Sequence, residues 1–191
     1  MSFTRSDLPA LRDPRALRAL AHPARLAILE RLSSDGPATA TECADVTGQS
    51  PSACSYHLRA LARWGLVAES EGQDRRERRW AVTGPFVIGD HHEPRRADVA
   101  AAEHVLVEQV LNRASARVLS WMDGLDDETQ EWRDASRVST SSLLVTSDEL
   151  AGLLDEVDRL IAPYRSSGRR ADAPADARRV HLHLSAVPSA S

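Results

Sequence analysis

The chain has 191 residues, enough for one large or two small domains and for a core that needs no disulfide or metal staple. Its two cysteines lack CxxC spacing, no apolar run approaches the ~18 residues of a membrane helix, and the N-terminal residues lack a signal-peptide core. We therefore expect a soluble cytoplasmic protein. All basic residues are arginine, and charge balances of +2 over residues 1–83 and −6 over residues 84–191 make up the net charge of −4. This asymmetry places a polyanionic partner on the N-terminal half.

Two helices are expected before residue 36. Asp13 and Pro14 form an N-cap and a first-turn proline, which predicts a short helix through Leu20. The dipeptide His22-Pro23 breaks that helix and begins a second one. The second helix is expected to bury its apolar residues, which are Leu26, Ile28, Leu29 and Leu32.

The next two helices have the spacing of a helix-turn-helix. Thr39 and Glu42 are a capping-box pair, which predicts a helix over Ala40–Thr47 that Gly48 ends. A second helix follows after only a few residues, and two helices joined in this way are typical of DNA-binding proteins.

The stretch from Ser50 to Val67 reads as the recognition helix and its exit. Ser50 is a good N-cap, Pro51 suits the first helical position, and Gly65 suits the stop. A buried stripe is expected at Cys54, Leu58 and Leu61. The residues expected on other faces, free to meet a partner, are Ser52, Ser55, Tyr56 and Arg59. A short helix with small polar and basic residues outward fits the major groove.

A basic hairpin is expected directly behind this helix. Leu66–Ser70 and Arg76–Val82 have strand composition and are separated by turn residues. At or near the tip stand Arg75, Arg76 and Arg78. Such an arginine run in isolation is more often a solvated strand, but behind a helix-turn-helix it predicts a wing that contacts the duplex backbone.

Three stretches together resemble ArsR-type winged helix-turn-helix transcriptional regulators: Leu17–Leu32, Thr39–Val67, and the arginine hairpin that ends in Trp80. The resemblance covers roughly residues 13–83. It implies a dimeric regulator that binds operator DNA and often responds to an effector.

By this resemblance the DNA-reading or phosphate-contacting helix holds Ser52, Ser55, Tyr56, His57 and Arg59, and the wing holds Arg75 and Arg76. His57 has two interpretations. It can donate a hydrogen bond to a phosphate, or it can be a partly buried histidine bonded to a nearby carbonyl.

Metal ligands were sought because many ArsR-type proteins sense metals. The candidates are Asp90, His91, His92 and Glu93, with His104 and Glu108 downstream. The last two are out of step with the zinc motif of the family's dimer helix, and one residue of offset rotates a helical side chain by ~100°. Cys43 and Cys54 fall on apolar stripes, and His181 and His183 form only a common strand pattern. We predict no metal, no cofactor and, in the absence of a catalytic motif, no enzyme.

A linker over 85–96 and a long helix over 97–125 follow the wing. The helix has a broad apolar stripe, so we expect it to pair with a second copy through Leu106, Val110 and Val118. The alternative is that it packs entirely within its own subunit. The predicted domains are therefore a DNA-binding domain over 1–84 and a dimerisation and effector domain over 97–191.

A small α+β extension is expected after the long helix. Glu128–Asp134 is a helical turn, Arg137–Val145 and Arg179–Val187 read as paired strands, and a capping box at Thr146 begins a helix over 147–164. We expect the leucine face of that helix to be covered. A small organic effector is expected in an apolar pocket where this unit meets Trp121.

The sequence thus predicts a mainly α protein that binds double-stranded DNA as a homodimer, acts as a repressor and does not enter a membrane. A winged helix that binds proteins instead of DNA is the alternative, and a small enzyme that uses the C-terminal unit is a third possibility.

Overall fold

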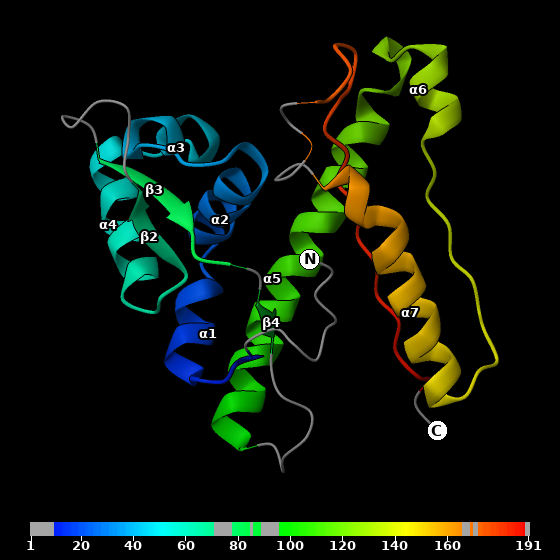
Figure 1. Ribbon diagram of the computed structural model, residues 1–191, viewed down its shortest axis with the longest axis horizontal. Coiled ribbons are helices and arrows are strands. Elements are labelled where there is room, and N and C mark those ends of the chain that lie inside the picture. Colours follow the sequence, from blue (N-terminus) through cyan, green and yellow to red (C-terminus); the bar gives the residue numbers. More distant parts are fainter. Residues whose placement is uncertain are drawn as a thin grey trace.

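The structure is a computed structural model, and it describes residues 10–70, 78–84, 86–88, 96–165, 169 and 172–189. Its elements are β1 (Ala10–Leu11), α1 (Pro14–Leu20), α2 (Pro23–Asp35), α3 (Ala40–Thr47), α4 (Pro51–Ala62), β2 (Val67–Ser70), β3 (Arg79–Val82), β4 (Val87–Ile88), α5 (Ala97–Asp123), η2 (Leu125–Asp127), α6 (Gln130–Ala135), α7 (Ser147–Ile161) and η3 (Ala162–Tyr164). Figure 1 shows α1 to α4 with the β2–β3 hairpin on one side of α5, and α6 with α7 on the other. The predicted mainly α class is confirmed.

Side-chain caps fix where the N-terminal helices begin, as the sequence predicts. Thr39 Oγ1 accepts the backbone N–H of Glu42 at 3.2 Å, and Glu42 Oε2 accepts the N–H of Thr39 at 2.6 Å, which completes the capping box of α3. Ser50 Oγ accepts the N–H of Ala53 at 3.2 Å and caps α4. These bonds satisfy backbone donors that a helix start leaves unpaired.

The predicted wing strands form an antiparallel hairpin base. Val67 pairs with Val82 and Ser70 with Arg79, while the tip lies outside the described residues. A further bridge joins Trp80 to Ala38, whose N–H and C=O exchange bonds of 2.9 and 2.8 Å with it. No pattern in the sequence indicates this bridge or the parallel pairing of β1 with β4.

The core of the N-terminal half continues into α5. Buried side chains from α1, α2, α3, α4 and the hairpin form one cluster, and Ala102 and Leu106 of α5 belong to it. Farther along α5, Arg113 Nε donates to Glu30 Oε2 of α2 at 2.8 Å, and Arg117 also pairs with Glu30. The first half of α5 is therefore packed as part of the N-terminal unit.

The C-terminal unit corrects the predicted α+β extension. Residues 137–145 and 179–187 are extended, but neither forms a strand with any described part of the chain. Figure 1 shows the two segments running on opposite sides of α7, so they are not neighbours within one chain. Alternation of apolar and polar residues predicts a face suited to burial, but it does not identify a partner strand. A two-stranded sheet also needs support from other elements.

The leucine face of α7 is also less covered than expected. The helix begins at its predicted capping box on Thr146, but none of its residues is buried and Leu160 is 72% exposed. Without the sheet, the expected effector pocket beside Trp121 loses one of its walls. None of the helices in the described part of the chain is long and apolar enough to cross a membrane.

Candidate nucleic-acid interface

Helix α4 has two chemically different faces, as the sequence predicts. The stripe of Cys54, Leu58 and Leu61 has no exposed surface and packs into the core. On the other side Tyr56 is 62% exposed, and Ser52 and Arg59 are exposed as well. Ser50 is exposed at the helix start, and Ser55 is half-buried. The exposed set combines an aromatic ring, hydroxyl groups and a guanidinium on one short helix.

The turn before α4 holds that helix at a fixed angle to α3. Gly48 adopts a φ of +64°, in the left-handed region that favours glycine, and its N–H closes α3 on the carbonyl of Ala44. Thr47 Oγ1 donates to the carbonyl of Cys43 at 3.0 Å and lies 3.2 Å from Cys54 Sγ. Contacts between α3 and α4 therefore position the exposed face of α4.

His57 lies on the buried side of α4 and is not among its exposed groups. The residue is only 7% exposed, and its Nε2 lies 3.0 Å from Gln49 Oε1. A side chain this buried does not reach a phosphate, so the structure favours the second interpretation, a buried histidine bonded to a nearby carbonyl oxygen. His57 is removed from the predicted DNA-contacting set.

A second histidine packs against it. The His22 ring centroid lies 4.7 Å from that of His57, and His22 Nδ1 accepts the N–H of Ala24, which caps α2. Burial lowers the pKa of both imidazoles, and the charge of Arg25 lowers both further; His57 is also affected by His22. This cap was not visible in the sequence, where histidine is not an expected N-cap residue.

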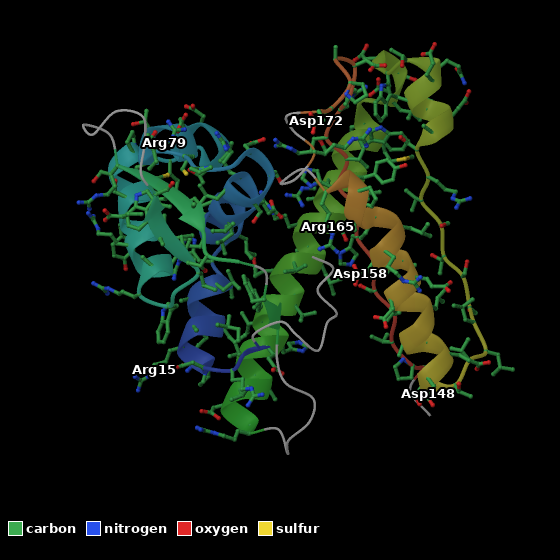
Figure 2. The ribbon with its side chains drawn as sticks, viewed as in Figure 1. Arg15, Arg79, Asp148, Asp158, Arg165 and Asp172 are labelled. Atoms are coloured by element: carbon green, nitrogen blue, oxygen red, sulfur yellow. The ribbon has the colours of Figure 1, made fainter. Side chains whose placement is uncertain are left out.

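The two described arginines of the wing, Arg78 and Arg79, make different contacts. Arg79 Nη2 donates to the carbonyl of Pro37 at 2.8 Å and pairs with Glu42 Oε2 at 3.1 Å, so it ties the wing to the start of α3 (Figure 2). Arg78 is exposed and pairs with Glu69 across the hairpin at 3.2 Å. Arg75 and Arg76 lie outside the described residues.

The three predicted dimerisation residues lie on different parts of α5. Leu106 is fully buried against its own chain, so it has no surface to offer a second copy. Val110 is half-buried against the same core, and Val118 is 40% exposed. The alternative of packing within the subunit therefore applies to the first half of α5, while the second half, which is held to α2 by Arg113 and Arg117, keeps exposed apolar residues such as Val118.

The structure offers no metal centre among the residues it describes. No three His, Cys, Asp or Glu side chains gather closely enough there to hold an ion, and His104 and Glu108 are exposed. His91 and His92 lie outside the described residues. Burial raises the pKa of the Cys43 thiol to about 11, which disfavours the thiolate that binds metals.

Residues 20–70 match the model of a helix-turn-helix domain family. Residues 20–70 are a helix-turn-helix domain. The domain is ArsR-like, so the resemblance inferred from the sequence is confirmed over that stretch, and helix-turn-helix domains of this kind bind DNA.

Two structures of one double mutant of Lactococcus lactis ZitR are similar to the chain at 19% identity. The match to the apo form covers 72% of this chain and 83% of the ZitR chain, with a TM-score of 0.34. The other covers 71% and 75% with a TM-score of 0.33. No curated protein matches the chain.

Proposed function

We propose that the protein is a sequence-specific DNA-binding transcriptional regulator that acts as a homodimer and represses its targets. The two-sided character of α4 carries the proposal. Its buried stripe locks the helix into the helix-turn-helix, and its exposed face presents the groups that read bases and grip phosphates. The excess of arginine over acidic residues in the N-terminal half supports a polyanionic partner.

In this proposal α4 enters the major groove. Ser55 and Tyr56 read base edges, and Ser50, Ser52 and Arg59 contact the backbone or adjacent bases. The wing arginines Arg75, Arg76 and Arg78 contact phosphates beside the groove. A two-fold dimer presents two such helices about 34 Å apart, one duplex turn, so the operator is expected to be a palindrome.

The division of labour follows the predicted boundaries. Residues 1–84 read DNA, 85–96 link, and 97–191 serve assembly and the response to a small organic effector. Val118 and the other exposed apolar residues of the second half of α5 supply dimer contacts, with Val110 at their edge. The protein works in the cytoplasm and catalyses no reaction. As a repressor it occupies the operator and excludes polymerase.

The test begins with selection of bound fragments from genomic DNA, followed by titrations of the selected duplex over a range of salt. Arg59→Ala is expected to weaken binding to all duplexes and to reduce the salt slope by about 1, because one phosphate contact is lost. Tyr56→Ala is expected to change the sequence preference. Arg165→Ala is the matched control, because this arginine is exposed in the other half of the chain and pairs with Asp158 (Figure 2).

Equal loss from Arg165→Ala and Arg59→Ala would contradict the assigned interface. Failure of the unaltered protein to select or bind any duplex at low salt would favour the alternative, a winged helix that binds proteins.

A further inference from the structure

The C-terminal half of the chain carries most of the exposed apolar surface. Of the nineteen large hydrophobic residues that are exposed in the described part of the chain, seventeen lie beyond residue 96. They come from α5, α7, η3 and the two extended segments on either side of α7. A soluble monomer rarely exposes a contiguous apolar patch larger than about 300–600 Å². Exposed apolar surface of this kind is typical of an interaction site.

The segment Arg179–Val187 stands out within that surface. It is extended, and no backbone hydrogen bond joins it to any described residue. From Arg179 to Ala186 its apolar residues alternate with polar ones, and Val187 ends the alternation; both sets are exposed. A backbone with free donors and acceptors on both edges is a template for another strand.

The start of this segment is firmly held by its own chain. Arg178 donates to both carboxylate oxygens of Glu128 at 2.8 Å and lies 4.6 Å from the ring centroid of Trp132. Arg179 pairs with Asp35 of α2. The segment is thus anchored at one end. Beyond the anchor, His183 Nε2 lies 2.8 Å from Ser185 Oγ within the segment and His181 lies near Arg117 of α5, but the backbone of these residues makes no hydrogen bond to another described backbone group.

We propose that this segment pairs antiparallel with the same segment of a second copy, about a two-fold axis at His183. In that register Leu182 lies opposite the partner's Leu184, and Val180 lies opposite the partner's Ala186. The apolar residues from Val180 to Ala186 of both strands then share one face, because their sequence pattern is symmetric about residue 183, while Val187 lies on the polar face. The polar face brings His181 opposite the partner's Ser185.

Self-complementarity favours a second copy over another occupant. A two-fold interface requires that one surface fit itself, and the alternation around His183 meets that requirement. The segment over 137–145 has no such symmetry, since Leu143, Leu144 and Val145 are consecutive. A stable interface needs about 800 Å² from each partner, which a strand pair alone does not supply.

The remaining area is available next to the strand. A two-stranded ribbon is marginal by itself, so its apolar face must pack on other elements. Leu153 and Leu160 of α7 and Leu119 and Met122 of α5 are large, exposed and apolar. The ribbon covers these side chains in both copies, which would also explain why α7 lacks buried residues in a single chain.

The pairing rests on the dimer part of the proposed function and refines it. It is tested by oxidation of single-cysteine substitutions in the full chain, with products resolved on a non-reducing gel. His183→Cys places two thiols at the axis and is expected to give a covalent dimer. His181→Cys places them four residues out of register, ~13 Å apart, and is expected to stay monomeric on the gel. The double variant His181→Cys with Ser185→Cys is expected to cross-link.

The unaltered chain is the background control, because Cys43 and Cys54 are buried, and His183→Ser controls for loss of the imidazole. Sedimentation and DNA titration are run on every variant. A dimer in sedimentation without cross-linking of His183→Cys would overturn the strand pairing and leave the proposed dimer standing. A monomer would overturn both, while DNA binding is judged separately by titration. Equal cross-linking of His181→Cys and His183→Cys would overturn the register and with it the proposal.

Discussion

Two positions on α4 allow its structural and functional faces to be separated. Leu58 is fully buried in the core, and Tyr56, two residues earlier, is mostly exposed. Leu58→Ala removes a packed side chain and leaves a cavity, which costs about 2–5 kcal/mol in the free energy of unfolding. A loss of about 3 kcal/mol moves the urea midpoint down by about 1–3 M for a small domain. Tyr56→Ala is expected to change the free energy of unfolding by no more than about 0.5 kcal/mol, as for other surface substitutions.

The assay is urea unfolding of the full chain, monitored by circular dichroism. All variants are measured at one protein concentration, because the stability of a dimer depends on concentration. Binding to the selected duplex is measured in parallel under native conditions. Tyr56→Ala is expected to lose specific binding with its stability intact, and Leu58→Ala to lose stability first. If Tyr56→Ala lowered the urea midpoint as much as Leu58→Ala, the assignment of the two faces of α4 would be refuted.

Two further predictions concern stability. In the folded state the pKa values of His22 and His57 lie below their ordinary value of 6.5. As the pH falls through 6.5, the unfolded chain therefore binds more protons than the folded chain does. The free energy of unfolding is thus highest above pH 6.5 and declines below it. Urea midpoints from about pH 7.5 to about pH 5 should show this decline, and His22→Asn combined with His57→Gln should flatten it; an equally steep decline in the double variant would exclude the histidine pair as its cause. Gly65→Ala should cost about 1–2 kcal/mol in the free energy of unfolding, because Gly65 has a φ of +67°. Gly152→Ala, inside α7 with open space around it, should stabilise the protein by about 0.5–1 kcal/mol. In thermal unfolding, Gly65→Ala should therefore lower the Tm and Gly152→Ala should raise it.

The local elements of the N-terminal half could be predicted from the sequence because their signals are local. The capping box at Thr39 and Glu42 and the cap at Ser50 each act within three residues, so α3 and α4 begin where the pattern indicates. The bridge between Ala38 and Trp80 joins residues far apart in sequence, and no spacing in the chain indicates it. The position of His57 was likewise undecided, since helical periodicity does not distinguish a partly buried face from an exposed one.

The C-terminal half shows the opposite case. Alternation over 179–187 indicates a strand, but a strand exists only where another strand lies beside it, and the described chain provides none. The stripe of α5 predicted burial along the whole helix, yet only its first half meets α1. A hydrophobic pattern thus predicts which face of an element is suited to burial. It does not predict which element packs against that face, because that depends on contacts between residues far apart in the sequence.

The double attachment of α5 makes it a lever. Its 27 residues form a rod about 40 Å long. Ala102 and Leu106 fix one part of the rod in the helix-turn-helix core, and Arg113 and Arg117 pair with Glu30 of α2 about two and three turns beyond Leu106. A rod held at successive turns cannot tilt without carrying α1 and α2 with it. In the proposed dimer, force applied to the far end of α5 by a ligand or by the other subunit is therefore transmitted to α1 and α2, and so to the distance between the two α4 helices.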